Sequence, residues 1–446
     1  MPTPLHAFQA PKGTRDLYPI DAARRRFVME AWRSASIRHG FDEIDGPIFE
    51  HLDLYTVKSG EGIVSELFSF TREGGEKTYA LRPEFTPTLA RMYAAKANAL
   101  PKPTKWFMAG PFFRAERPQR GRLREFLQWN VDLLGDASPG ADAEVIATCV
   151  SMLRGVGLTP KDVRIKVNHR AALSQWLVAR GVPETSHGEL FKLLDAKDKM
   201  PAPEFIMKLA AYGFLPQQAE VFQKGIIRVS VEEGMPGTAD SVVDMTFFSQ
   251  AVMPLAQQLV AAGIIDWIDF DLSVVRGLAY YTGMVFEVHE AGGKERAIAG
   301  GGRYDNLVEL FGGPPTPAVG FGMGDVVLAL VLQDRGLMPP DAALLEKAGL
   351  RPDVFVISSA EPAAEAQVRP VVAAFREAGL HARHSYKATK NVGKLLQDAA
   401  ACRARFAVII ESGEFAMIKN LETGDQDQRP CPLGIVVAEV GRRLGR

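Results

Sequence analysis

The 446-residue sequence contains little cysteine, almost no net charge and no long uninterrupted apolar run. Its three cysteines, Cys149, Cys402 and Cys431, are widely spaced and have no histidine at metal-ligand spacing. A disulfide framework and a structural zinc site are therefore disfavoured, and a reducing compartment is the natural setting. No segment approaches the ~20 apolar residues of a membrane-spanning helix. The first residues lack the apolar core of a signal peptide, so we expect a cytoplasmic protein.

The charges nearly cancel, because 52 Lys and Arg residues oppose 53 Asp and Glu residues. No overall field would attract a polyanion, so any binding of nucleic acid must rely on local basic patches. A hydrophobic content of 47% with 24% charged residues is ordinary for a globular protein. The length predicts two or more domains.

One strongly basic segment lies between two apolar runs within residues 112–132. Because apolar residues flank it on both sides, we expect two antiparallel strands joined by a polar loop. Several guanidinium groups in one loop repel each other unless a polyanion binds, and the arginine fork matches phosphate oxygens. A nucleoside triphosphate site and a solvated charged turn both fit this segment by itself. Its charged residues are Arg114, Glu116, Arg117, Arg120, Arg122 and Arg124.

Two further segments carry charged residues in unusual surroundings. Residues 79–91 change from strand-like to helix-like around Glu84, and Pro83 disfavours helix at the residue before it. A carboxylate at such a turn suits an ammonium group, although a capping role also fits. In residues 274–287, Arg276 lies among apolar and β-branched residues. A guanidinium there needs an anionic ligand or a buried ion-pair partner.

At these three places together the chain resembles histidyl-tRNA synthetase, a family of class II aminoacyl-tRNA synthetases. Residues 11–16 resemble the N-terminal signature of that family, and residues 41–50 resemble class II motif 1, with Pro47 as its proline. Residues 110–135 resemble motif 2. The segments Arg276-Gly-Leu-Ala-Tyr-Tyr281 and Gly301-Gly-Arg-Tyr304-Asp resemble the histidine-binding segments of the family. The resemblance covers nearly the whole chain.

The resemblance implies a histidine–tRNA ligase that uses ATP as a substrate, with Mg²⁺ bound to the ATP. Histidine is first activated to histidyl-adenylate and then transferred to the 3′ end of histidine tRNA. Such chemistry depends mainly on positioning and on charge stabilisation. Arg114 and Arg276 match the catalytic arginines, and the sequence offers no dedicated metal site. The positions that match the ATP-binding residues are Arg114, Glu116, Arg122 and Phe126.

The same resemblance implies a site that recognises histidine by hydrogen bonds to its ammonium group, carboxylate and ring. A site that binds both ring nitrogens rejects analogues that lack them, so no editing is required. Core aromatics with satisfied hydroxyls remain an alternative for the two tyrosines. The matching positions are Glu84, Thr86 and Gln128 for the ammonium group, Arg276 for the carboxylate, and Asp132, Tyr281 and Tyr304 for the ring.

The expected fold is α+β, with an antiparallel-sheet catalytic domain of class II type at residues 1–334. Helical periodicity dominates residues 169–263, which predicts a mostly helical insertion. Prolines flank an expected linker at residues 335–352, and the strand–helix alternation of residues 353–446 predicts a small α/β domain. This tail resembles the anticodon-binding domain of several class II synthetases. A helix should run over residues 21–39, with Asp21 as its cap and Gly40 after its end.

Three positions depart from the family pattern. Val327 stands where class II motif 3 normally has an arginine that helps to bind ATP. Ala279 replaces a common acidic residue and Phe85 replaces a usual glycine. The alternating glycines at residues 320–324 resemble a dinucleotide-binding loop only weakly, and we expect a strand whose small residues let ATP approach closely.

These departures leave an alternative of a different class. A non-catalytic paralogue could serve as the regulatory subunit of ATP phosphoribosyltransferase in histidine biosynthesis. Such proteins lose catalytic arginines and usually lack the C-terminal domain, whereas this chain keeps Arg114, Arg276 and that domain. The enzyme is therefore the favoured interpretation.

The resemblance also predicts partners. Motif 1 packs across a two-fold axis in class II synthetases, so we expect a homodimer. In the C-terminal domain, Lys387, Lys390 and Lys394 are candidate contacts to tRNA phosphates, although a solvated helix face fits them as well.

Overall fold

A computed structural model of the chain describes residues 9–59, 61–179, 181–197, 200–224, 226–227, 246–276, 280–359, 361–387, 389 and 391–446. The chain forms two compact units. One comprises Met1–Asp16 and Val28–Met338, and the other comprises Leu17–Phe27 and Pro339–Arg446. The domain limits expected from the sequence, at residues 334 and 353, stay predictions.

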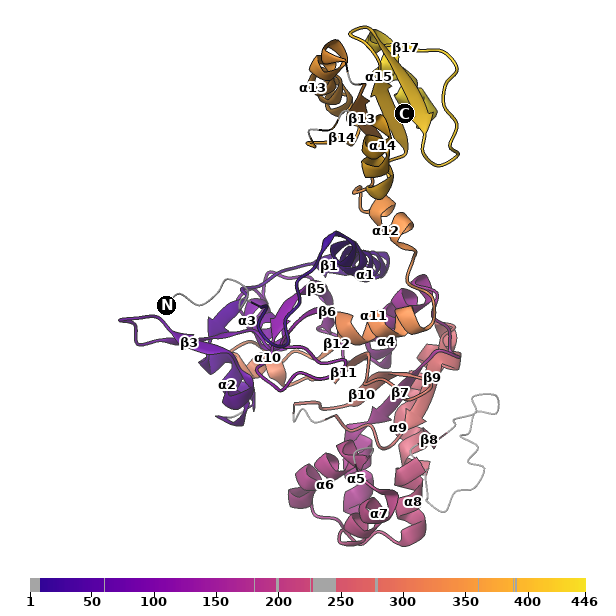
Figure 1. Ribbon diagram of the computed structural model, residues 1–446. Helices are drawn as coiled ribbons and strands as arrows, with labels where there is room; N and C mark the ends of the chain where they lie inside the picture. Colours follow the sequence, from indigo (N-terminus) through magenta and orange to yellow (C-terminus); the bar gives the residue numbers. More distant parts are fainter. Residues whose placement is uncertain are drawn as a thin grey trace, which may run out of the picture. The chain divides into compact units, whose positions relative to one another are not determined.

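The first unit is built on a sheet of nine described strands in the order β1-β5-β6-β12-β11-β10-β7-β9-β8 (Figure 1). The pairs β1–β5 and β7–β9 are parallel, and the other neighbouring pairs are antiparallel. This sheet confirms the fold class predicted for the catalytic part. The strands are β1 Asp42–Glu43, β5 Thr104–Phe113, β6 Glu125–Leu134, β7 Val163–His169, β8 Ile226–Ile227, β9 Ile268–Asp271, β10 Met284–Glu290, β11 Ala299–Arg303 and β12 Ala318–Gly324.

One face of this sheet is an apolar core. Side chains alternate along a strand, so Trp129, Val131 and Leu133 of β6 share that face, and all three are buried. Trp129 stacks on Trp32 with ring centroids 6.2 Å apart and meets Phe321 edge-on at 4.9 Å. Trp32 belongs to helix α1 (Pro19–Arg38), which therefore lies against this face. The opposite face of β6 remains available for polar side chains.

Between β7 and β9 the chain forms the mostly helical insertion that the periodicity predicts. Figure 1 places α5 to α8 together beyond the β8 end of the sheet. Strand β8 lies within the insertion and extends the sheet through antiparallel pairing with β9. The helices are α5 Arg170–Ala179, α6 His187–Asp195, α7 Ala202–Ala210, α8 Pro216–Lys224 and α9 Thr246–Ala261.

A small three-stranded sheet, in the order β2-β4-β3, precedes the long central strands in sequence. Helix α3 follows β4 directly, and its buried residues join an apolar cluster with Met108, Phe112 and Leu307. The strands of this sheet and the helices beside them in sequence are β2 Phe49–His51, α2 Asp53–Ser59, β3 Ser69–Thr71, β4 Thr78–Leu81 and α3 Thr86–Ala94. Three further helices of the first unit are α4 Pro139–Gly155, α10 Leu307–Leu310 and α11 Asp325–Asp334.

Helix α1 corrects one detail of the sequence prediction. It begins at Pro19, so Asp21 lies inside the first turn and is not the N-cap as predicted. An aspartate in the first turn still favours the helix, because its charge opposes the positive end of the helix dipole. Gly40 follows the helix with φ of 70°, as expected for a glycine that ends a helix.

The second unit is a five-stranded sheet in the order β14-β13-β15-β16-β17 with helices on both faces. Val354 and Val356 of β13 pack with α13 and α15, whereas Phe355 and Ile357 pack with α14. The alternation buries both faces, which confirms the predicted α/β fold of the tail. Its elements are α12 Asp341–Lys347, β13 Val354–Ser358, α13 Pro362–Glu377, β14 Ala382–His384, α14 Val392–Ala401, β15 Phe406–Ile410, β16 Phe415–Asn420, β17 Cys431–Pro432 and α15 Val436–Arg443.

Candidate active site

The predicted hairpin is formed by β5 and β6, which pair over their full length. The Arg114 amide donates to the carbonyl of Arg124 at 2.9 Å, which closes the arginine-rich loop. At the loop tip, Gly121 has φ of 74°, a conformation that side chains rarely adopt. Arg120 joins the tip to the segment after β10 through an ion pair with Glu295. The loop is therefore fixed at its base and at its tip.

The second face of β6 is polar. Gln128, Asn130 and Asp132 lie on this face, because they alternate with the buried Trp129 and Val131. Gln128 Oε1 and Asn130 Nδ2 are buried and have no hydrogen-bond partner among the described residues. Unpaired buried polar atoms are costly, so these two atoms indicate a polar ligand. Sequence reasoning missed Asn130, although the alternation of polar residues along β6 could have revealed it.

Glycines form the floor beside these side chains. A Cβ atom on Gly320 of β12 would lie 2.1 Å from Asp132 Oδ1, and one on Gly322 would lie 2.6 Å from Gln128 Nε2. Both distances are too short for real contacts, so β12 needs glycine where the β6 side chains lean across it. The alternating glycines lie in a strand, as predicted, and do not form a dinucleotide-binding loop.

Asp132, Tyr281 and Tyr304 form a buried polar cluster. The Tyr304 hydroxyl donates to Asp132 Oδ1. Burial raises the pKa of Asp132 from 3.8 to about 7, although the bond from Tyr304 opposes this shift. The ring of Tyr280 contacts both tyrosine rings of this cluster, with its centroid 4.6 Å from that of Tyr281 and 6.0 Å from that of Tyr304. The structure thus brings together all three residues predicted to contact the histidine ring.

Arg276 reaches this cluster from a strained backbone position. Its φ of 50° lies in the left-handed region, which is uncommon for residues other than glycine. Its guanidinium lies 5.7 Å from the centroid of the Tyr281 ring and 3.4 Å from Glu287 of β10. Within the described residues, the buried Nε has no hydrogen-bond partner. Residues 277–279, including the substituted Ala279, lie outside the described residues.

The position of Arg276 depends on Gly300 of β11. A Cβ atom on Gly300 would lie only 1.3 Å from Arg276 Nη1. Burial acts to lower the pKa of Arg276, but the nearby Tyr281 and Glu287 outweigh it and the pKa lies above its ordinary value. Arg276 therefore stays charged in its half-buried position. The ion pair considered as the alternative is present, although it is only half-buried, and it leaves the Nε donor of the guanidinium without a partner among the described residues.

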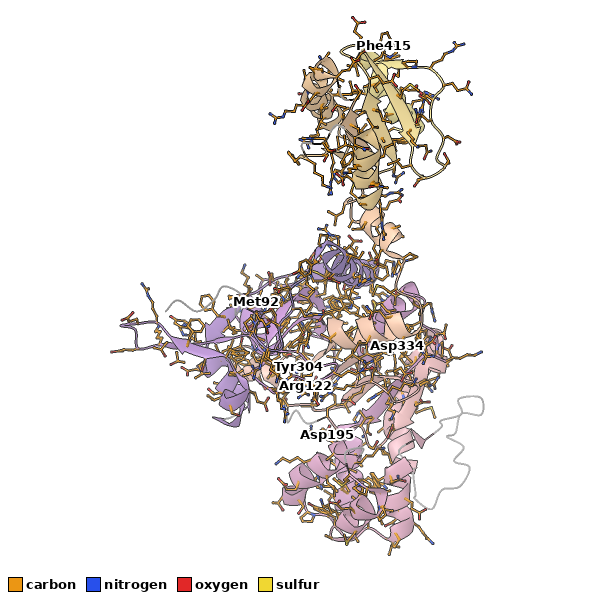
Figure 2. All side chains as sticks on the ribbon, viewed as in Figure 1. Met92, Arg122, Asp195, Tyr304, Asp334 and Phe415 are labelled. Carbon is orange, nitrogen blue, oxygen red and sulfur yellow. The ribbon has the colours of Figure 1, made fainter. Side chains whose placement is uncertain are left out.

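Arg114, Arg122, Glu116 and Phe126 lie together at the mouth of the hairpin. The Arg114 guanidinium lies 5.2 Å from the centroid of the Phe126 ring, and its Nε donates to the carbonyl of Pro83 at 3.2 Å. Arg122 forms an ion pair with Glu116. Burial and the nearby Arg122 lower the pKa of Arg114, whereas Glu84 and Glu116 act to raise it. Figure 2 labels Arg122 and Tyr304, which both belong to the first unit.

Glu84 and Thr86 lie at the start of α3. Glu84 is half-buried, and its charge acts to raise the pKa of both Arg114 and Tyr281, so it lies near enough to interact with both. The N-cap of α3 is Phe85, without a side-chain cap bond, which excludes the capping role considered for Glu84. Thr86 is the first residue of α3.

Arg82, just before this turn, is 1% exposed and donates to the carbonyls of Gly46 and Pro111, both at 2.8 Å. It thereby joins the segment of motif 1 to the motif 2 hairpin. These contacts could not be predicted from the sequence, because every residue has a backbone carbonyl group and the residue type therefore does not reveal which one accepts.

The family model described as histidyl-tRNA synthetase matches residues 13–325. The chain belongs to the histidyl-tRNA synthetase family. Histidine--tRNA ligase of Haloarcula marismortui is 38% identical over 440 residues, which cover 95% of this chain and 96% of the relative. Histidine--tRNA ligase of Opitutus terrae is 38% identical over 428 residues, which cover 92% of both chains. Relatives that match over more than nine tenths of both chains thus carry the name of the enzyme.

Solved structures of this family share the fold. The histidyl-tRNA synthetase of Nostoc sp. PCC 7120 superposes with a TM-score of 0.73 at 23% identity and covers 98% of this chain and 99% of its own. A Bacillus halodurans protein described as an ATP phosphoribosyltransferase regulatory subunit/histidyl-tRNA synthetase gives a TM-score of 0.70 at 21% identity, over 91% and 99% of the two chains. At this identity the likeness shows the fold alone. The named full-length relatives do not favour the regulatory alternative.

This histidyl-tRNA synthetase family member differs from the family pattern at the start of α11. Val327 is buried, 6% exposed, where the motif 3 arginine would stand. Two residues earlier, Asp325 accepts from the Leu127 amide at 2.9 Å and pairs with Arg15 at 2.8 Å. Arg15 belongs to the N-terminal signature, so Asp325 holds that segment against β6.

The helices of this synthetase family member, as far as the structure describes them, are too short or too polar to cross a bilayer. The described residues also contain no group of three or more His, Cys, Asp or Glu side chains arranged to hold a metal ion.

Proposed function

We propose that the chain is a histidine–tRNA ligase, which activates histidine with ATP and transfers it to the 3′ end of histidine tRNA. One observation carries the proposal. The charged Arg276, the polar face of β6 and the buried Asp132–Tyr304 pair surround one glycine floor. Cations, unpaired amide atoms and a carboxylate are the groups required by a substrate that is itself an amino acid.

In the first step, an oxygen of the histidine carboxylate attacks the α-phosphorus of ATP. The new phosphorus–oxygen bond forms as the bond to the bridging oxygen breaks, and pyrophosphate leaves with that electron pair. Arg114 and Arg276 act on the α-phosphate, where negative charge is redistributed in the transition state. The unused donor of Arg276 supports this role, since a ligand oxygen would satisfy it.

ATP binds along the hairpin. Phe126 stacks on the adenine, Glu116 binds the adenine edge, and Arg122 contacts the distal phosphates. Because Glu116 and Arg122 pair with each other here, ATP must exchange that ion pair for contacts of its own. Mg²⁺ arrives as part of the ATP substrate and neutralises the phosphates, so it requires no cage of protein ligands.

Histidine is recognised at both ends. Glu84, Thr86 and Gln128 accept hydrogen bonds from its ammonium group, and Asp132, Tyr281 and Tyr304 surround its ring. A ring N–H donates to the Asp132 carboxyl, which Tyr304 orients. An isosteric ring without this donor would leave a buried carboxyl unpaired, and such an analogue is strongly rejected.

The second unit contributes tRNA binding. A cavity of about 650 Å³ lies at the carboxyl ends of β13 and β14, and it is lined by Arg369, His384 and Tyr386 among others. Ligands bind outside the carboxyl ends of parallel strands in open sheets. Tyr386 is 86% exposed and offers a ring on which a base can stack.

The lysines near this cavity differ in availability. Lys387 is paired with Asp398 at 2.6 Å and would need to leave that pair to bind a phosphate. Lys394 lies at the start of α14, where its amide donates to the Asn391 side chain. Lys390 lies outside the described residues. The phosphate contacts of all three remain proposals.

A homodimer is supported by an apolar patch on the three-stranded sheet. Phe49 and Phe70 are 51% and 45% exposed, and their ring centroids lie 5.9 Å apart. Contiguous exposed apolar side chains of this kind mark interfaces. The strand β2 that carries Phe49 overlaps the end of the motif 1 segment at residues 41–50, which is the segment expected at the two-fold axis.

We also place the protein in the cytoplasm, on the basis of its three free cysteines.

The test is histidine-dependent exchange of pyrophosphate with ATP, followed by charging of histidine tRNA, with the purified chain. We expect exchange with histidine and no other amino acid. Absence of exchange, together with binding to an ATP phosphoribosyltransferase, would establish the regulatory subunit instead.

A further inference from the structure

The loss of the motif 3 arginine leaves the arginine-rich hairpin facing Val327, an apolar side chain. Gly121, at the hairpin tip, is the residue of the hairpin that lies close to Val327. A Cβ atom there would lie 3.2 Å from Val327 Cγ2 and 3.8 Å from Arg296 Cδ. Val327 and Arg296 thus approach the same point of the hairpin from two elements, since Arg296 lies in the connection between β10 and β11.

Arg296 differs from the neighbouring arginines in its pairing. Among the described residues it forms no ion pair within 4.0 Å, and it is only half-buried. Burial and the charges of Arg122 and Arg114 lower its pKa, whereas Glu116 acts to raise it. The guanidiniums of Arg114, Arg122 and Arg296 therefore lie near enough to repel one another. Glu116 acts on both Arg296 and Arg114, whereas Glu84 and Glu66 act on Arg114. Like charges gathered in this way favour an anion between them.

Two other arginines near the motif 3 position already form ion pairs. Arg15 is paired with Asp325 at 2.8 Å, and Arg120 is paired with Glu295. Glu295 is 5% exposed at its side chain, so its pair with Arg120 fixes the residue next to Arg296 against the hairpin tip. This anchor holds the Arg296 backbone beside the hairpin and leaves its guanidinium available.

We propose that Arg296 binds the phosphates of ATP and supplies the cationic contact that Val327 cannot make. The proposal rests on the proposed function, because it assigns a further ATP-binding residue to the same site. A flexible arginine from the β10–β11 connection takes over from an arginine on the helix after β12. The fork of Arg296 can bind two phosphate oxygens at once, as the usual arginine would.

The test compares Arg296→Ala with Lys294→Ala in the full-length chain. Lys294 is exposed in the same connection, so this control also removes one positive charge. We expect Arg296→Ala to raise the KM for Mg·ATP in pyrophosphate exchange by about ten- to a hundredfold, the usual worth of a charge-assisted hydrogen bond. The KM for histidine should change less than about threefold. Lys294→Ala should leave both constants near the wild-type values.

A second variant and a binding measurement separate this role from a structural one. Arg296→Lys keeps the charge, and should bind Mg·ATP more tightly than Arg296→Ala and less tightly than wild type in calorimetry without histidine. An unchanged KM for ATP in Arg296→Ala would overturn the proposal. So would equal losses for ATP and histidine in both variants with a lowered Tm, which would indicate a structural residue. If wild type itself shows no histidine-dependent exchange, the proposed function fails and the ATP affinities still test Arg296.

Discussion

Replacing Gly300 with alanine should lower the activity of the enzyme by displacing Arg276, although no proposed catalytic residue is itself replaced. The new Cβ atom would lie 1.3 Å from Arg276 Nη1, whereas ordinary contact begins at 3.4 Å. The guanidinium must therefore retreat by about 2 Å, and misplacement by about 1 Å already costs about a hundredfold in rate. We expect histidine activation to fall by about two to three decades, close to the loss of a preorganised donor.

The fold should survive this substitution. The atom that the new methyl group meets is the far end of a flexible side chain, so the strand β11 need not move. Gly301 differs, because a Cβ atom there would lie 2.2 Å from the backbone oxygen of Gly320. We expect Gly300→Ala to keep the wild-type Tm within a few degrees, about 1 kcal/mol or less. Gly188→Ala is the control, because the new methyl group has nothing within 4 Å in helix α6.

The assay is single-turnover formation of histidyl-adenylate by wild type, Gly300→Ala, Arg276→Ala and the double variant. Both single variants act through one guanidinium, so their effects should not add. Activity of Gly300→Ala within a factor of a few of wild type would refute the reasoning. Additive losses would also refute it, because they would show that Gly300 and Arg276 act separately.

Three further predictions concern pH, tRNA and assembly. Burial raises the pKa of Asp132 from 3.8 to about 7, so its contribution to stability is fully present below the lower value and is lost as the pH rises through the higher one. Asp132→Asn should therefore gain stability relative to wild type between about pH 5 and pH 8, by about 3 kcal/mol, because about two pH units lie below the raised pKa at ~1.4 kcal/mol per unit. Thermal unfolding at the two pH values measures this gain. An equal difference at both pH values would contradict this. Tyr386→Ala should weaken tRNA binding by about 1–3 kcal/mol and leave pyrophosphate exchange unchanged, with the exposed Ile435→Ala as its control. Equal losses in both assays would argue against a role in tRNA binding. Light scattering should give a dimer that Phe49→Asp weakens, and a wild-type monomer at assay concentrations would exclude the dimer.

The local order of the chain was predictable because neighbouring residues decide it. The hairpin of β5 and β6 follows from two apolar runs around a polar loop, and the tail reveals its strands through continuous apolar runs. Short elements escaped prediction. Strand β14 has three residues, and helix α12 lies within the expected linker at 335–352. Elements this short contain too few residues to show the alternation of apolar and polar side chains that reveals a strand or a helix.

The candidate site residues were also proposed from the sequence, because their motifs resemble those of one family, as for Arg114, Asp132, Arg276 and Tyr304. Tertiary structure alone decided how they meet. The sheet order places β6, β12 and β11 side by side, so side chains far apart in sequence share one glycine floor. Gly300 makes room for Arg276, and Gly121 brings Arg296 beside Val327. Such contacts depend on distances of a few ångströms between distant segments, and local sequence patterns carry no information about those distances.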